Sequence, residues 1–156
     1  MRILIKIFIF LFLIFFISEN SFYAQQNPSS AAKALKVKMK SMFIYQFAKN
    51  VYWPKAYTTG DFTIGIYGSE DLYNLLNTSF KDKMNGSQKI KFDFYESASE
   101  ISDCHLLFVS GEEKESMASV QKVLNDKTLL VTEGKDLATT GSMINFVYVQ
   151  NRLKFQ

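Results

Sequence analysis

The sequence predicts an α/β fold: a single-domain layered sandwich with a central, mostly parallel mixed sheet flanked by helices. Two observations predict it. Runs rich in Val, Ile, Leu and Phe alternate with helical patterns along the chain, and this alternation is typical of parallel strands joined by helices. The last two strand-like runs are separated only by a short turn, which pairs them antiparallel and makes the sheet mixed. A chain of 156 residues is long enough for one such domain with a buried core.

The N-terminus has the layout of a secretory signal. Arg2 and Lys6 form a basic start, and a run of Ile, Leu and Phe follows before the chain turns polar. The run is shorter than the about 20 apolar residues of a membrane-spanning helix. We therefore expect a signal peptide at residues 1–24 and export of the remainder. Ala24 suits the last position before cleavage, but Phe22 stands where a small residue is preferred, so an uncleaved membrane anchor is the alternative.

A linker and a long helix are expected next. Residues 25–32 are polar and small and predict a linker, so the domain is expected to span 33–156. Apolar residues then recur at steps of three and four, which predicts a helix from near Ala32 to Val51. Pro54 ends this segment, because proline disfavours helical geometry in the residue before it. The apolar stripe consists of Leu35, Met39, Met42, Phe43 and Phe47.

The middle of the chain predicts two strands around a short helix. The segment 61–68 is β-branched and aromatic and ends in glycine, which predicts a strand, and Ser69 is placed to cap the helix that follows. Asn85-Gly86 is a turn signal. The segment 89–95 alternates charged and apolar residues. A strand with one solvated face, near a sheet edge, is therefore expected there.

The last third continues the alternation of strands and helices. Its helix starts with acidic residues, which suit the positive end of a helix dipole. The expected elements are a buried strand at 104–109, a helix at 112–124, a buried strand at 127–132, a loop or short helix at 134–140, and a hairpin of strands at 142–149 and 152–155.

Charge and cysteine content argue against nucleic-acid binding and against an internal disulfide. The formal net charge of +3 is too small to favour a nucleic-acid partner. The local excess at Lys33, Lys36, Lys38 and Lys40 is interpreted as a solvated helix face. Cys104 is the only cysteine, and we expect it to be buried as a small hydrophobic residue beside an apolar strand.

The sequence contains no catalytic constellation, so we expect no enzyme activity, no metal and no cofactor. His105, the only histidine, adjoins Cys104. Neighbours along a strand point to opposite faces, so the two side chains cannot form a nucleophile–base pair. One cysteine and one histidine do not make a zinc site. The segment 65–68 leads from a strand into a helix but lacks the G-x-G-x-x-G spacing of a dinucleotide loop.

Two loops offer a place for a small ligand. Gly68 and Ser69 follow one predicted strand, and Ser110 and Gly111 follow another. All four residues would lie at the carboxyl edge of the sheet, where open α/β folds bind ligands. The argument is one of analogy between folds, and it makes an exported small-molecule sensor the alternative function.

Five stretches of the chain carry a resemblance to a known family. The stretches are 43–54, 62–68, 104–110, 141–146 and 151–155, and the first is an aromatic-rich helix that leads to Trp-Pro. Together they resemble the YfiR-like family of periplasmic proteins, because all five keep that family's order and spacing over most of the exported part.

The resemblance implies a non-catalytic periplasmic regulator. In the best-known member, the domain restrains an inner-membrane diguanylate cyclase by contacting its periplasmic sensory part, and an outer-membrane lipoprotein can sequester the regulator. Family members can also form homodimers. We therefore expect this chain to bind the periplasmic part of an inner-membrane diguanylate cyclase or sensor kinase and to modulate cyclic-di-GMP and biofilm formation. A hydrolase or transferase and a structural envelope protein are the weaker alternatives.

The chain departs from the family pattern in two ways. The best-known member has paired cysteines that form disulfides, whereas this chain has only Cys104. The family also usually continues past the final strand into further sheet and an apolar helix, whereas this chain stops at Gln156. Either the sequence is truncated at its C-terminus or that element is absent. An absent element would leave apolar surface for a dimer or another partner.

Aromatic and arginine residues near turns are the candidates for partner binding, because Trp, Tyr and Arg are enriched at binding hot spots. The candidates are Tyr52, Trp53, Tyr57 and Arg152. The competing interpretation of Trp53 is a core residue that closes the first helix on the sheet. The competing interpretation of Arg152 is an ordinary solvated strand residue.

Overall fold

The computed structural model describes residues 28–111, 117–150 and 152–156. The chain divides into two units, Met1–Lys33 and Ala34–Gln156, and the fold described below is that of the second. The expected signal peptide lies outside the described residues. In the described part of the chain, no helix is both long and apolar enough to cross a membrane.

One mostly parallel mixed sheet organises the domain, which confirms the predicted fold class. Its strands are β1 (Phe62–Tyr67), β2 (Met84–Asn85), β3 (Gln88–Tyr95), β4 (Leu106–Val109), β5 (Leu129–Glu133), β6 (Ile144–Val149) and β7 (Arg152–Phe155). They lie in the order β2-β3-β1-β4-β5-β6-β7. The five central strands run parallel, and β2 and β7 each pair antiparallel with the strand beside them.

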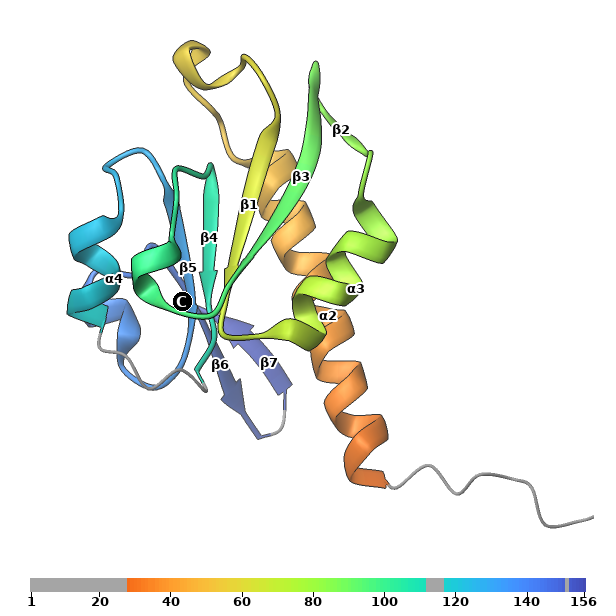
Figure 1. Cartoon of the computed structure of the whole chain (residues 1–156). Coiled ribbons are helices and arrows are strands. Elements are labelled where there is room, and N and C mark those ends of the chain that lie inside the picture. The colour runs from red at the N-terminus through yellow and green to blue at the C-terminus, as the bar shows by residue number, and fades with distance from the viewer. Residues whose placement is uncertain (1–27, 112–116, 151) are drawn as a thin grey trace, which may run out of the picture. The chain divides into compact units, whose positions relative to one another are not determined.

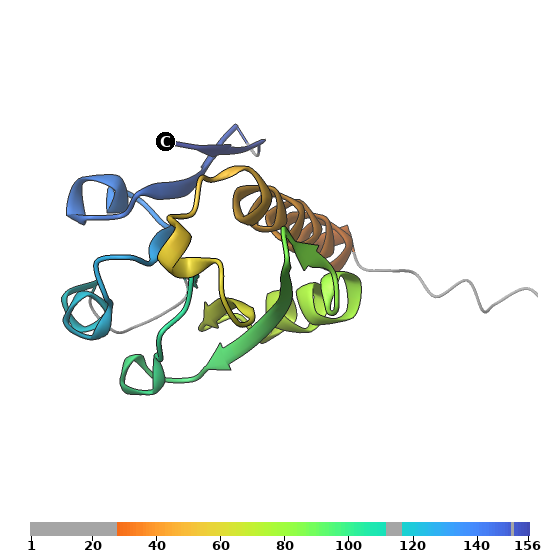
Figure 2. The same ribbon diagram turned by 90° about the horizontal axis from the view of Figure 1, so that it is seen from above.

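Helices cover both faces of the sheet. The α-helices of the described residues are α2 (Pro28–Asn50), α3 (Glu70–Phe80) and α4 (Met117–Val123), and the short 3₁₀ helices are η1 (Lys55–Tyr57), η2 (Ala98–Glu100) and η3 (Leu137–Thr140). From Ala34 onward, α2 lies with α3 against one face of the sheet, and α4 lies with η2 against the other (Figures 1 and 2). This arrangement is the layered sandwich that the alternation of strands and helices predicts.

The first helix differs from its prediction at its start and in its buried stripe. It begins at Pro28, so the end of the expected linker is helical; proline suits the first helical turn because the N–H it lacks would be unbonded there. Leu35 and Met42 of the predicted stripe are exposed. The buried positions, which again recur at steps of three and four, are Val37, Lys40, Ser41, Ile44 and Ala48.

The two faces of the sheet bury two separate apolar clusters, because successive side chains of a strand point to opposite faces. The cluster under α2 and α3 contains Ile44, Phe62, Ile64, Ile66, Leu72, Leu76, Leu106, Phe108 and Phe146. The cluster under α4 and η2 contains Tyr67, Tyr95, Ala98, Cys104, Leu107, Val109, Val120 and Leu130. Each large side chain buried in this way contributes about 1.5–3 kcal/mol to folding.

Gly65 lies in the middle of β1, where the strand leaves room for an aromatic ring. A Cβ atom at this position would lie 2.7 Å from the ring of Tyr95 and 3.0 Å from the side chain of Leu107. Close packing between neighbouring strands therefore explains the glycine.

The short elements are the ones that the sequence does not predict. β2, η1 and η2 contain two or three residues each, which is too few to show a periodicity. β4 begins at Leu106, so Cys104 and His105 precede the strand instead of lying in it. The first residues of the helix expected at 112–124 lie outside the described residues, and α4 ends at Val123.

Candidate functional site

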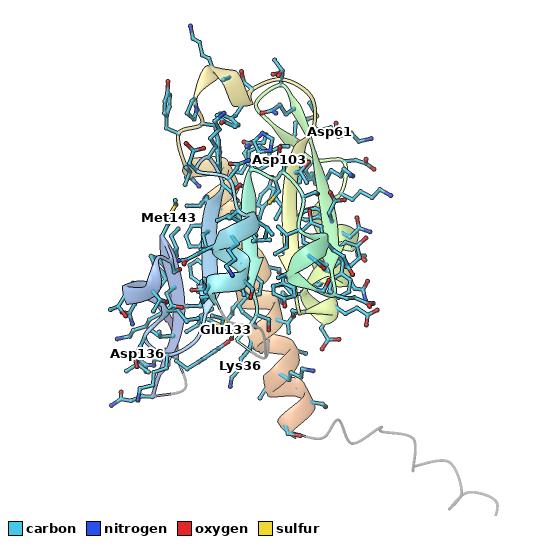
Figure 3. All side chains as sticks on the ribbon, turned by 60° about the vertical axis from the view of Figure 1, so that its left-hand side comes forward. Lys36, Asp61, Asp103, Glu133, Asp136 and Met143 are labelled. Atoms are coloured by element: carbon cyan, nitrogen blue, oxygen red, sulfur yellow. The ribbon has the colours of Figure 1, made fainter. Side chains whose placement is uncertain are left out.

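Aromatic residues gather at the amino end of the parallel strands. Three of them precede β1 and the fourth precedes β4, so the strand register brings them to the same end of the sheet. This amino-edge cluster consists of Tyr52, Trp53, Tyr57 and His105. Figure 3 shows the same end of the sheet through Asp61 and Asp103, which lie far from Glu133 and Lys36 at the other end.

Trp53 fastens the end of α2 to the start of β1. Its indole Nε1 donates a hydrogen bond to the carbonyl of Ala48 at 2.9 Å. Its ring meets the Phe62 ring edge-on, with 5.0 Å between centroids, and Phe62 is fully buried. The interpretation of Trp53 as a residue that closes the helix on the sheet therefore fits this geometry better than a free binding side chain.

His105 joins three segments of the amino-edge cluster. Its Nε2 lies 2.9 Å from the carbonyl of Tyr57, and its Nδ1 accepts a hydrogen bond from the backbone N–H of Thr63 at 3.2 Å. The imidazole also stacks on Phe62 at 4.4 Å between centroids. These partners require a neutral ring that carries its proton on Nε2. Burial lowers the pKa of His105 below its usual 6.5 and opposes the charged form.

The two tyrosines of the cluster differ in what they offer to a partner. Tyr52 is 85% exposed. Tyr57 is half-buried, Lys127 Nζ lies 5.2 Å from its ring centre, and its hydroxyl is buried without a hydrogen-bond partner in the described part of the chain. Tyr52 is therefore the predicted contact residue whose ring is accessible.

Arg152 does not lie near the amino-edge cluster. It is exposed at the start of β7 and pairs in register with Val149, the last residue of β6. This position is at the carboxyl end of the sheet. The four predicted partner-binding residues thus form one group of three and one distant arginine.

The four residues predicted to form a ligand crevice do come together. Tyr67 pairs in register with Val109, so Gly68 and Ser110 follow neighbouring strands, and the N–H of Ser110 donates to the carbonyl of Tyr67 at 3.0 Å. Strand order reverses between β1 and β4, and open α/β folds bind ligands at such a point. Ser69 follows Gly68 at the start of α3, and Gly111 lies so close to the carbonyl of Glu133 that a Cβ would collide with it.

A buried ion pair lies at the same carboxyl edge. Lys40 Nζ donates to Glu133 Oε2 at 2.7 Å, and the two side chains are only 9% and 16% exposed. The expectation that Lys40 belongs to a solvated helix face is therefore wrong, because Lys40 occupies the buried stripe of α2. Nearby, Lys36 lies 4.6 Å from the ring centre of Tyr148. Burial, together with the Glu133 carboxylate, raises the pKa of Tyr148 to about 12.

Two of the cavities formed by the described residues lie along the sheet. One of about 400 Å³ is formed between α3 and β3, and one of about 300 Å³ lies beside β5 and β6 and includes Glu133, Phe146 and Tyr148. Neither cavity is lined by Gly68, Ser69, Ser110 or Gly111.

Cys104 is buried, as the sequence predicts. Burial raises the pKa of its thiol to about 12, so the thiol stays protonated and is a poor nucleophile. Cys104 packs in the cluster under α4, whereas His105 packs on Phe62 in the opposite cluster. Among the described residues, no group of three or more His, Cys, Asp or Glu side chains could hold a metal ion.

A comparison with protein-family models matches residues 37–156 to the YfiR/HmsC-like family. The chain belongs to this family. Membership indicates a periplasmic regulatory role in cyclic-di-GMP signalling, and the family is one of regulators rather than enzymes. A comparison with curated proteins gives no match.

The sequence reasoning missed the polar contacts of the carboxyl edge. Thr132 Oγ1 lies 2.8 Å from Asn145 Oδ1, and Asn145 Nδ2 donates to the carbonyl of Gly134 at 2.8 Å. A signal for the ion pair was present, because Lys40 lies three residues after Val37 and four before Ile44 on the buried stripe. Its partner, Glu133, is too far along the chain for any local pattern to indicate it.

Proposed function

We propose that this protein is a non-catalytic periplasmic regulator that binds the periplasmic part of an inner-membrane signalling protein and holds it inactive. The signalling protein is a diguanylate cyclase or a sensor kinase, and its restraint lowers cyclic-di-GMP and surface attachment. A regulator of this kind acts by binding one conformation of its target more tightly than the other. A difference of about 1–3 kcal/mol is enough for a useful bias.

The amino-edge cluster carries the proposal. Tyr52 is 85% exposed and follows the end of α2, which Trp53 joins to the sheet through its bond to Ala48 and its packing on Phe62. An aromatic side chain presented from a rigid support is a typical anchor of a protein interface. Family membership supports the same reading, since it points to regulation rather than to chemistry.

Deletion of the gene is the direct test. We expect cyclic-di-GMP and surface attachment to rise in the deletion strain and to return to normal when the wild-type gene is supplied. Unchanged levels in the deletion strain would contradict the proposal. Further partners, an outer-membrane lipoprotein that sequesters the regulator or a second copy of the chain, belong to the same proposal and would be found by co-purification of the full chain.

The alternative function, a small-molecule sensor, is favoured by one observation. Gly68, Ser69 and Ser110 lie together at the point where strand order reverses, which is the usual ligand position of open α/β folds. A thermal-shift screen of the exported chain with nucleotides and aromatic amino acids tests it. A ligand that binds there raises the melting temperature, and a uniformly flat screen would count against the sensor.

A further inference from the structure

The two edges of β3 are paired very differently. On its inner side, β3 pairs with β1 over the whole of Ile90–Tyr95. On its outer side, β2 pairs only with Gln88 and Lys89, and the carbonyl of Lys83 accepts the N–H of Ile90 at 2.8 Å. In the described part of the chain, no strand pairs with the outer edge from Lys91 to Tyr95. Although β3 is second in the sheet order, it therefore behaves as an edge strand from Lys91 to Tyr95.

The direction of each backbone group on β3 follows from two hydrogen bonds. The carbonyl of Tyr95 accepts the N–H of Gly68, which follows β1, so Tyr95 points inward. The N–H of Ile90 points outward, to Lys83. Because backbone groups alternate in direction along a strand, the N–H and C=O groups of Phe92 and Phe94 point outward. These four groups form a template for one more strand.

A groove lies beside this template. Its volume is about 400 Å³. One wall is formed by Tyr73 and Asn77, which lie four residues apart on α3, and by Lys81, which follows the end of the helix. The β3 segment 89–93 forms the other wall. The Tyr73 ring lies 5.6 Å from the Phe94 ring and adds an apolar contact beside Phe94. A slot between a helix and an open strand edge is the geometry in which extended peptides add to a sheet. We call it the β3–α3 groove.

The charges of the groove narrow the choice of occupant. Its lining contains three lysines and three aspartates, and Lys89 pairs with Asp82 at 2.7 Å while Lys91 pairs with Asp93 at 2.9 Å. A balanced lining does not favour an anion or a nucleic acid. Lys91 and Asp93 lie two residues apart on one face of β3, so an added strand fits best when it carries an acidic residue opposite Lys91 and a basic residue opposite Asp93.

We propose that the β3–α3 groove binds an extended segment of the partner protein as an additional strand beside β3, with acidic and basic residues alternating with apolar ones. This inference rests on the proposed function, because it names how the partner is held. A second copy of the chain fits less well. The antiparallel register that sets Lys91 opposite Asp93 of the copy also sets Phe94 opposite Ile90, whose N–H already bonds Lys83.

Amide hydrogen exchange of the full exported chain tests the open edge and its occupant. In the free protein, the amides of Phe92 and Phe94 should exchange fast and those of Asp93 and Tyr95 slowly. The probe is a capped nine-residue peptide in which Val alternates with Glu and Lys, added at millimolar concentration. It should slow exchange at Phe92 and Phe94 about tenfold or more, and the same peptide with N-methylated backbone should not.

A pair of tryptophan variants tests the groove in the cell. Asn77→Trp fills the groove from α3, whereas the matched control Asn74→Trp lies at an exposed position of the same helix outside it. Asn77→Trp should raise cyclic-di-GMP to the level of the deletion strain, and Asn74→Trp should restrain it like the wild type. If Asn77→Trp folds poorly, the charge reversal of Lys91→Glu with Asp93→Lys replaces it.

Each outcome decides the proposal. The proposal is overturned if a folded Asn77→Trp variant keeps cyclic-di-GMP at the wild-type level. It is also overturned if the peptide does not slow amide exchange at Phe92 and Phe94. Slow exchange of Phe92 and Phe94 in the free protein overturns it as well. In that case, exchange rates that depend on protein concentration identify a second copy as the occupant. Exchange rates that do not depend on it identify another part of the same chain. If deletion of the gene leaves cyclic-di-GMP unchanged, the proposed function fails, while the peptide experiment still reports on the groove.

Discussion

The two ends of the sheet are stabilised by different kinds of interaction. At the carboxyl end, charged and polar groups are bonded to one another, as in the pair of Lys40 with Glu133 and the contact of Thr132 with Asn145. At the amino end, aromatic rings pack around His105, and Tyr52 stays exposed. Open α/β folds usually bind their ligands at the carboxyl end. Here the polar groups of that end bond to one another, and the amino end presents the accessible aromatic side chain of Tyr52.

Trp53 is the residue whose loss should damage the amino end most. Trp53→Ala removes the packing on Phe62 and the bond to Ala48, and it should lower the free energy of unfolding by about 3 kcal/mol. Trp53→Phe keeps a ring but loses the indole N–H, so it should lose about 1 kcal/mol. Urea denaturation of the exported chain measures both. Equal losses would mean that the hydrogen bond, not the ring, fastens the helix.

Glu133 is the corresponding residue of the carboxyl end. Glu133→Ala leaves the Lys40 charge buried without its partner, so it should lower the free energy of unfolding by about 2 kcal/mol. The double variant Lys40→Met with Glu133→Leu should lie within about 1 kcal/mol of the wild type, because it removes both charges at once. Urea denaturation again gives the values. A double variant as unstable as the single one would show that the pair itself stabilises the fold.

The titration of His105 gives the amino end a pH dependence. Its pKa is lowered in the folded protein, so the unfolded chain binds the proton more readily. Stability is then complete above about pH 6.5 and falls as the pH drops through the lowered folded pKa. We therefore expect the melting temperature of the wild type to be lower at pH 5 than at pH 7.5. His105→Gln should reduce this difference, as measured by thermal unfolding at the two pH values. Because the chain has no other histidine, a slope that persists in the variant would contradict this assignment.

The sequence was a good guide to the long elements and a poor one to the polar contacts. The strands Phe62–Tyr67 and Gln88–Tyr95 could be predicted, because β-branched residues and the alternation of polar and apolar residues are local signals of a strand. The stripe of α2 was misplaced because Phe43 and Phe47 are also spaced like a buried face. They lie half-buried at its side, against Phe155 of β7.

The candidate sites also differ in how far the sequence predicts them. Gly68 and Ser110 could be placed together from the sequence, because both follow parallel strands. The open edge of β3 could be anticipated only in part. The alternation of Lys89–Tyr95 predicted a solvated face near an edge, but not that β2 would pair with just two residues and leave Phe92 and Phe94 uncovered.

The smallest effect on stability should come with a large effect on function. Tyr52→Ser changes an exposed side chain, so the free energy of unfolding should change by less than about 0.5 kcal/mol. If the amino end anchors the partner, this variant should nevertheless raise cyclic-di-GMP toward the deletion level. The matched control is Arg152→Ser, a change of another exposed residue at the carboxyl end. If Arg152→Ser releases the signalling output and Tyr52→Ser does not, the partner contacts the carboxyl end, and the comparison of the two ends must be reversed.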